Sequence, residues 1–209
     1  GPIHVTVMDQ YTSYSPGSAQ LQWITDDLAR TNKTWKFILL HEPGWSAYGG
    51  HPNNTIVQAY IQPLCLQYGV SIVFGGHNHY YARATVPLVN GVQHLTLGGG
   101  GAPLSTPDIF MPYVVASSRT NHHCTIAIDG DTLWFKAFNT ANGMAIDSFT
   151  LLRPAVAPDS TFPSVALAAP EGGETWKAGS VHSIIWSATD DVGIAAVDLA
   201  YSTDGGGSF

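Results

Sequence analysis

Two short apolar runs, each followed by a histidine motif, constrain the fold of this chain more than any other feature. The runs span residues 35–40 and 70–74 and are rich in β-branched and aromatic side chains, which is typical of buried strands. Between them, the apolar residues of segment 52–68 recur with a period near four, which predicts a helix. The sequence therefore predicts a β-α-β unit whose two strands lie parallel in one sheet.

Histidines follow both predicted strands at the point where each strand ends. His41 opens the sequence His-Glu-Pro, and His77 and His79 lie in Gly-His-Asn-His. Because parallel strands have their carboxyl ends at one edge of a sheet, where ligand sites form, we expect the three imidazoles to converge. Imidazole nitrogen suits zinc, iron and manganese, and the one-residue spacing lets His77 and His79 point at two neighbouring ions. The pattern predicts half of a dinuclear metal site.

These motifs, in this order, resemble those of the calcineurin-like metallophosphoesterases, and especially of the purple acid phosphatase branch. The resemblance covers roughly the first 150 residues and includes four segments: 15–23 before a helix, His41-Glu42-Pro43, 76–83 and the glycine run 98–101. It implies an α/β fold, the C-terminal half of an αββα sandwich in which mixed sheets are flanked by helices. It also implies that His41 and His77 bind one metal ion and that His79 binds the other, the two ions being iron, manganese or zinc.

The resemblance implies an activity as well. Enzymes of this family hydrolyse phosphate esters with two metal ions that hold a bridging hydroxide, which attacks phosphorus. They have a substrate-binding histidine ten residues after the position of His41, which makes His51 the candidate catalytic acid and phosphate contact. His51 lies in a turn-rich loop, where a solvated surface histidine is the alternative. Asn78 is a second candidate for contact with the phosphate, or else a linker residue.

Other motifs of the family are absent from this sequence ahead of His41. These are Asp-x-His, Gly-Asp and Gly-Asn-His-Glu, which supply the remaining ligands and the carboxylate that bridges the metals. We therefore expect the chain to be a fragment that lacks the amino-terminal ligand motifs and is inactive alone. Ala82 stands where the family has a glutamate beside Arg83, which leaves the partner of this arginine open.

The chain changes character after the glycine run. Three strands joined by tight turns are expected to close the catalytic sheet, at 122–128, 132–139 and 144–152. Prolines without periodicity predict an extended linker over 154–163, which places the catalytic portion at 1–153. Residues 164–209 resemble part of an all-β, immunoglobulin-like accessory module of bacterial and archaeal extracellular proteins. Its expected strands are 165–169, 182–187 and 195–201.

Composition bears on the compartment and on the partners. Charged residues make up 11% of the chain, against about 25% in an average globular protein, which favours a secreted protein. The net charge of -7 argues against nucleic acid as a partner, and no apolar stretch approaches the roughly 18 residues of a membrane span. A phosphate ester is the partner that the motifs indicate. Its type, the metals and the oligomeric state stay open.

A second class of function also stays open. In this alternative the phosphoesterase scaffold is degenerate, and together with the immunoglobulin-like module it forms a non-catalytic surface protein for adhesion or carbohydrate binding. The missing motifs separate the two classes, because their presence upstream would establish the enzyme.

Overall fold

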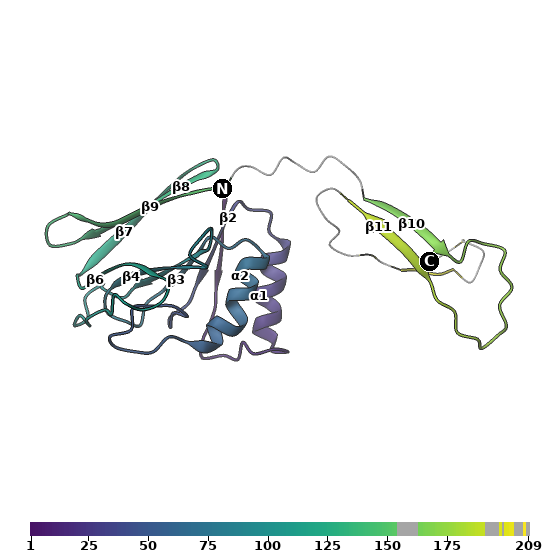
Figure 1. The fold of residues 1–209 in the computed structure, drawn as a ribbon, viewed down its shortest axis with the longest axis horizontal. Helices are drawn as coiled ribbons and strands as arrows, with labels where there is room; N and C mark the ends of the chain where they lie inside the picture. The colour runs from purple at the N-terminus through teal and green to yellow at the C-terminus, as the bar shows by residue number, and fades with distance from the viewer. Residues whose placement is uncertain (154–162, 191–196, 198, 203–206, 208–209) are drawn as a thin grey trace. The chain divides into compact units, whose positions relative to one another are not determined.

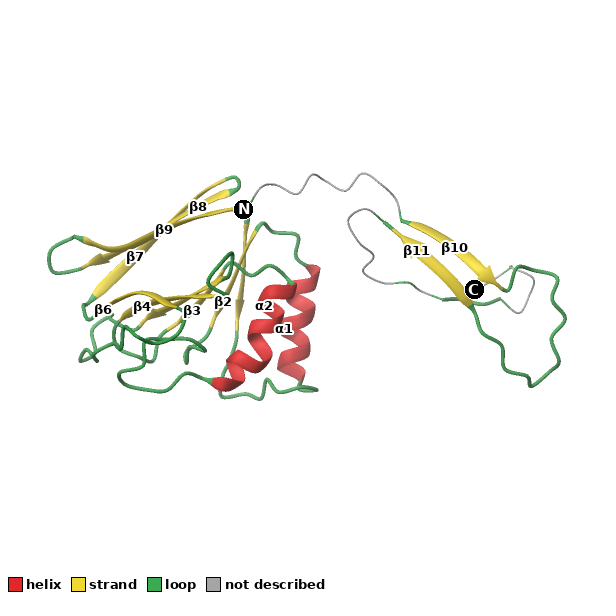
Figure 2. Ribbon diagram, in the orientation of Figure 1, coloured by secondary structure: helices red, strands yellow, loops and turns green. Residues whose placement is uncertain are grey.

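The computed structural model describes residues 1–153, 163–190, 197, 199–202 and 207. The chain divides into two compact units, Gly1–Ala155 and Val156–Phe209, which we describe separately. The first unit contains two sheets and all of the helices found in the described residues, and the second contains a two-stranded sheet (Figure 2).

A six-stranded mixed sheet forms the centre of the first unit. In spatial order its strands are β1 (Ile3–Val7), β2 (Trp35–Leu39), β3 (Ile72–Gly75), β5 (Val92–Leu97), β4 (Tyr81–Val86) and β6 (Val114–Ser118). The first four are parallel, whereas β4 runs antiparallel to both of its neighbours. The predicted parallel pairing of the two apolar runs is confirmed, with Phe37 opposite Ile72.

Helices cover one face of this sheet (Figure 1). α1 (Ala19–Arg30) begins at Ser18, whose side chain accepts a hydrogen bond from the Leu21 amide at 3.2 Å. The predicted crossover helix is confirmed, although it begins with a wider π-helical turn, η1 (Val57–Ile61), before α2 (Gln62–Gln67). The wider turn precedes Pro63, which has no amide hydrogen to donate to the preceding turn.

A three-stranded antiparallel sheet packs on the opposite face. It consists of β7 (His122–Asp129), β8 (Thr132–Asn139) and β9 (Ala145–Leu152). The three predicted strands are confirmed, but the expectation that they close the catalytic sheet is wrong, because they form a sheet of their own. The alternation along β8 explains this: Leu133, Phe135 and Ala137 are fully buried, so this apolar face stacks on the large sheet rather than pairing along its edge.

An ion pair joins the two sheets. Arg83 of β4 donates from Nε to Asp147 Oδ2 at 2.7 Å and from Nη2 to Oδ1 at 3.1 Å, and Asp147 lies on β9. The Tyr81 hydroxyl donates to the same carboxylate at 2.6 Å. Burial raises the pKa of Tyr81, and the neighbouring Asp147 raises it further. The hydroxyl therefore stays protonated and donates the hydrogen bond. Asp147 is therefore the partner of Arg83 that the sequence left open.

The second unit contains the antiparallel pair β10 (Ser164–Ala169) and β11 (Ile185–Thr189). The strand expected at 165–169 is confirmed, whereas β11 begins three residues later than the expected strand at 182–187. The linker over 154–163 lies outside the described residues except for its last position, and so do residues 195, 196 and 198 of the third expected strand. The described residues of that segment, 197 and 199–201, are not in a strand. The immunoglobulin-like assignment of this unit and the domain limits stay predictions.

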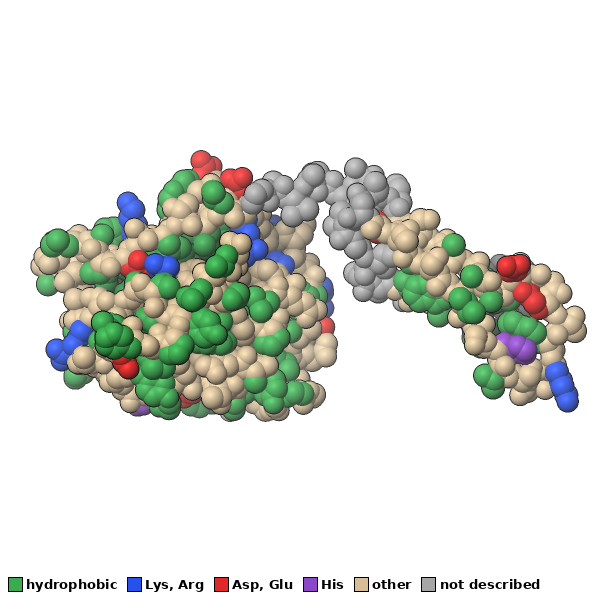
Figure 3. All heavy atoms as spheres, in the orientation of Figure 1, with side chains coloured by type: hydrophobic (Ala, Val, Ile, Leu, Met, Phe, Trp, Pro, Cys, Tyr) green, Lys and Arg blue, Asp and Glu red, His purple; other side chains and the backbone are tan. Residues whose placement is uncertain are grey.

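The surface agrees with the low charge of the sequence. On the face in Figure 3, acidic and basic side chains are few, and apolar and uncharged polar groups cover most of the area. Over the parts of the chain that the structure describes, no helix is both long and apolar enough to cross a bilayer.

Candidate metal centre

Two loops meet at the carboxyl edge of the large sheet, beyond β2 and β3. The strand pairing continues past both strands: the amide of Leu40 donates to the Phe74 carbonyl at 3.0 Å, and the amide of Gly76 donates to the His41 carbonyl at 2.9 Å. Backbone hydrogen bonds thus fix the loop that carries His41 against the loop that carries His77. The sheet holds the two histidine motifs together, as their positions after parallel strands predict.

Three imidazoles lie together at this edge. His77 Nδ1 lies 3.1 Å from His41 Nε2, and the ring centroids are 4.9 Å apart. The ring of His51 packs on His77 with a centroid distance of 4.0 Å. The backbone of His77 has a φ of 63°, in the left-handed region that non-glycine residues seldom adopt. Such strained positions cluster at functional sites.

The geometry of these nitrogens suits metal ligands. Two imidazole nitrogens bound to one tetrahedral ion at about 2.0–2.1 Å lie roughly 3.3 Å apart, close to the observed His41–His77 separation. His79 Nδ1 lies 3.0 Å from the Pro103 carbonyl and must donate to it, because a carbonyl only accepts. The lone pair of His79 is therefore on Nε2, as in metal-bound histidines held by a backbone carbonyl.

The donor set is nevertheless incomplete. Nowhere in the described residues do three or more His, Cys, Asp or Glu side chains come together so that they could hold one metal ion. His41 and His77 form a pair, whereas the ring of His79 contacts the Pro103 carbonyl. Burial lowers the pKa of His77, and the neighbouring His51 lowers it further. A lower pKa favours the neutral imidazole, which is the form that binds a metal ion.

Gln10 holds the His41 loop from the side of β1. Its Oε1 accepts from the backbone amides of His41, at 2.7 Å, and Glu42, while its Nε2 donates to the Glu42 carbonyl at 2.9 Å. The Glu42 carboxylate itself accepts from Asn54 Nδ2 at 2.8 Å, at the start of the crossover helix. Sequence reasoning missed Gln10, because a single glutamine after a strand has no motif.

Asn78 fixes the loop that carries His51. Its side chain is fully buried, accepts from the His51 amide at 2.7 Å, and donates to the His51 carbonyl at 3.2 Å and to Ser46 Oγ at 3.1 Å. The amide group is thus committed to the loop. This geometry shows that Asn78 positions the backbone of His51, and the phosphate contact that the sequence suggested for Asn78 stays a prediction.

The same loop has two further restraints. Asn53 Oδ1 accepts from the backbone amide and the hydroxyl of Ser46, at 2.8 Å and 2.7 Å. Gly49 has a φ of 80°, and a β-carbon there would lie 1.7 Å from the Thr106 carbonyl oxygen. The turn-rich segment is therefore restrained on both sides of His51, while the His51 side chain itself is exposed beside His77.

The layers of the first unit, helices on a mixed sheet and an antiparallel sheet behind it, are those of the metallophosphoesterase fold. A purple acid phosphatase from yellow lupin (Lupinus luteus) seeds superposes with a TM-score of 0.67 at 24% identity, covering 73% of this chain and 31% of that one. GAP50, titled the anchor in the inner membrane complex of Plasmodium, gives a TM-score of 0.60 at 13% identity over 72% of this chain and 49% of its own. At these identities the likeness shows the fold, and the predicted fold class is confirmed.

Sequence comparison relates the chain to one family that has this fold. Residues 2–81 match the family model of the calcineurin-like phosphoesterases. A purple acid phosphatase of Glycine max is 28% identical over 118 residues, 47% of this chain and 25% of the relative. The Fe(3+)-Zn(2+) purple acid phosphatase 12 of Arabidopsis thaliana is 26% identical over 177 residues, 72% of this chain and 38% of the relative. The chain therefore spans between a quarter and two fifths of the length of these relatives. The resemblance to this family and its purple acid phosphatases is confirmed, while the ligand assignments stay predictions.

Proposed function

We propose that this chain carries part of the active site of a metal-dependent phosphoesterase of the purple acid phosphatase branch, which hydrolyses phosphate esters. The contact between His41 Nε2 and His77 Nδ1, with His51 packed on His77, carries the proposal. Each of these residues follows from a motif that the sequence shares with the family. The separation of the His41 and His77 ring nitrogens, 3.1 Å, is close to that of two imidazole ligands on one tetrahedral ion.

The proposed ligands fall into two groups. His41 and His77 bind one ion, and His79, whose Nε2 is left available by its bond to Pro103, binds the second. The ions are iron, manganese or zinc, and one relative is named for an iron–zinc pair. When bound, such a pair neutralises phosphate oxygens and activates a water for attack.

His51 is the proposed acid. Its imidazole is exposed at the edge of the site, whereas its backbone is fixed on both sides by Asn78. An imidazole at this place can donate a proton to the leaving oxygen of the ester and hydrogen-bond to the phosphate. The restrained loop keeps the ring beside His77 before substrate binds.

The remaining ligands, including a bridging carboxylate, belong in this proposal to sequence outside the chain. Three imidazoles bring no negative charge to balance two cations, and the nearby Glu42 is bonded to Asn54. The chain spans 25% of the Glycine max relative, which leaves ample sequence for the other ligands. We propose that the chain alone binds metal incompletely and is inactive, and that the whole protein is extracellular, as its low charge suggests.

The fold does not by itself choose an enzyme. The Plasmodium neighbour with the same fold is titled an anchor, which matches the alternative of a non-catalytic surface protein. The hydrolase is favoured by the paired imidazoles, because their ring nitrogens lie close to the separation of two ligands on one ion and belong to motifs shared with the family.

Zinc binding tests the proposal. In calorimetric titration of the chain with Zn²⁺ at neutral pH, we expect at most one well-bound ion rather than two, because His79 belongs to no metal-binding group in the part of the chain that the structure describes. His77→Ala should weaken that binding about tenfold or more. His123→Ala, which removes an exposed histidine outside the site, is the matched control and should bind like the parent chain. Equal zinc affinity in all three proteins would overturn the ligand assignment.

A further inference from the structure

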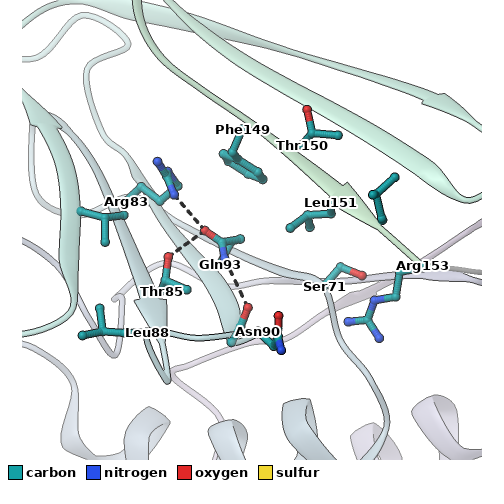
Figure 4. A pocket seen from close by; sticks show the side chains of 13 residues that line it. Ser71, Arg83, Thr85, Leu88, Asn90, Gln93, Phe149, Thr150, Leu151 and Arg153 are labelled. Atoms are coloured by element: carbon teal, nitrogen blue, oxygen red, sulfur yellow. Dashed lines mark hydrogen bonds between the residues drawn. The ribbon is translucent and has the colours of Figure 1, made fainter.

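A cavity of about 680 Å³ lies in the first unit, away from the candidate metal centre. Ser71, directly before β3, and Gln93, at the start of β5, lie in its wall. His77 follows the other end of β3, so the cavity and the histidines lie at opposite edges of the sheet. β9 contributes a further part of the wall, Phe149 to Leu152, and Figure 4 labels the first three of these residues. The proposed phosphoesterase function makes no use of this cavity.

The polar groups of the cavity differ in whether they are already paired. Arg83 is bound to Asp147 and also donates to Gln93 Oε1 at 3.2 Å. Arg153 has no such partner: within the described residues no carboxylate lies at ion-pair distance from it. Its guanidinium lies beside Gly69 instead. A β-carbon added to Gly69 would lie 3.2 Å from Nη1 of Arg153. Arg153 is therefore the cationic group of the cavity that is free to bind an anion.

A hydroxyl group beside this arginine is also unpaired. Ser71 is 2% exposed, and its Oγ has no hydrogen-bond partner. A buried hydroxyl that lacks a partner costs about 1–3 kcal/mol of folding free energy. Figure 4 shows Ser71 and Arg153 in the same part of the wall, with Arg83 and Gln93 in another part. An acceptor atom bound near Arg153 would satisfy both groups.

A second cation strengthens the positive field at this edge. Burial, and then the charge of Arg153, lower the pKa of Lys36, which lies on β2. Burial also lowers the pKa of Arg153. Two partly desolvated cations that repel each other are unfavourable, and an anion bound beside them would offset that repulsion.

The wall also has an apolar part, which would contact the body of a ligand. Its apolar side chains include Leu88, Val115, Phe149 and Leu151. The volume lies within the range of roughly 300–1,000 Å³ that is typical of small-molecule sites. The planar guanidinium of arginine matches a carboxylate, to which it donates two parallel hydrogen bonds. An inorganic anion would leave the apolar wall uncovered.

We propose that this cavity binds a small organic carboxylate, whose head group pairs with Arg153 and Ser71 and whose apolar body packs on Phe149 and Leu151. The site is independent of the metal centre, because it lies at the other edge of the sheet and uses none of its residues. A ligand there would bridge the large sheet, through Ser71, and the small sheet, through β9.

Benzoate is the probe for the test, because it combines a carboxylate with a planar apolar body. In amide ¹H–¹⁵N spectra of the metal-free chain, benzoate should shift the signals of Gly69, Ser71 and Gly91 saturably, whereas uncharged benzyl alcohol should not. Arg153→Gln should weaken benzoate binding about tenfold or more. Arg30→Gln, which removes an exposed arginine at the end of α1, is the charge-matched control and should leave binding unchanged.

Ser71→Ala separates binding from folding. Because it removes a hydroxyl without a partner, the variant should melt at the same temperature as the parent chain or higher, while binding benzoate more weakly. Benzoate shifts that persist in Arg153→Gln would overturn the proposal. It would equally be overturned by an absence of shifts at these amides, or by unchanged benzoate affinity in Ser71→Ala.

Discussion

Asn78 lies between two candidate metal ligands, yet its side chain is buried and bonded to another loop. It holds the backbone of His51 from both sides and reaches Ser46, which is in turn bonded to Asn53. A residue chosen only for its place between His77 and His79 thus determines where the proposed acid lies. The position of the proposed catalytic acid therefore depends on hydrogen bonds that no sequence motif reveals.

Replacing Asn78 tests this role. Asn78→Ala removes three hydrogen bonds and leaves buried partners unsatisfied, so we expect the free energy of unfolding in urea to fall by about 1–3 kcal/mol. The His51 amide should also exchange with solvent faster, because its acceptor is lost. Asn142→Ala, in an exposed turn, is the control and should change stability little. An unaltered exchange rate at His51 would contradict the positioning role.

Among the elements, β5 carries a buried histidine that no part of the proposed mechanism uses. His94 is 1% exposed, its Nε2 donates to Gln62 Oε1 at 2.8 Å, and its ring lies 4.7 Å from that of Trp45 between centroids. Nδ1 has no partner, and burial lowers the pKa of His94 to about 3. The β5 strand and the crossover helix are thus joined by an imidazole that must stay neutral.

This histidine predicts a pH dependence of stability. The unfolded chain takes up a proton at His94 below about pH 6.5, while the folded chain takes it up only near pH 3. The free energy of unfolding should therefore fall as the pH drops from about 6.5 towards 3, by up to about 1.4 kcal/mol per pH unit from this site. In His94→Asn this part of the slope should disappear, whereas His123→Asn, at an exposed site, should keep it. Parallel stability curves for all three proteins would exclude the effect.

For the whole molecule, local patterns predicted the elements better than their assembly. The apolar runs before His41 and His77 and the period of segment 52–68 were sufficient for the parallel strands and their crossover helix. The family resemblance implied stacked sheets, but the residue pattern did not show that β7–β9 form the second one, because the alternation along β8 shows an apolar face without showing what covers it. The roles of Gln10 and Asp147 depend on contacts between segments far apart in sequence, which a single chain without motifs at those places does not reveal.

The central claim is that His41, His77 and His79 bind metal through particular ring nitrogens. Long-range ¹H–¹⁵N spectra of the histidine rings, recorded as Zn²⁺ is added to the chain, report each nitrogen directly. We predict metal-bound shifts at His41 Nε2 and His77 Nδ1, a weaker effect at His79 Nε2, and none at His123. Metal-bound shifts at other histidines, with the rings of His41 and His77 unchanged, would contradict the account.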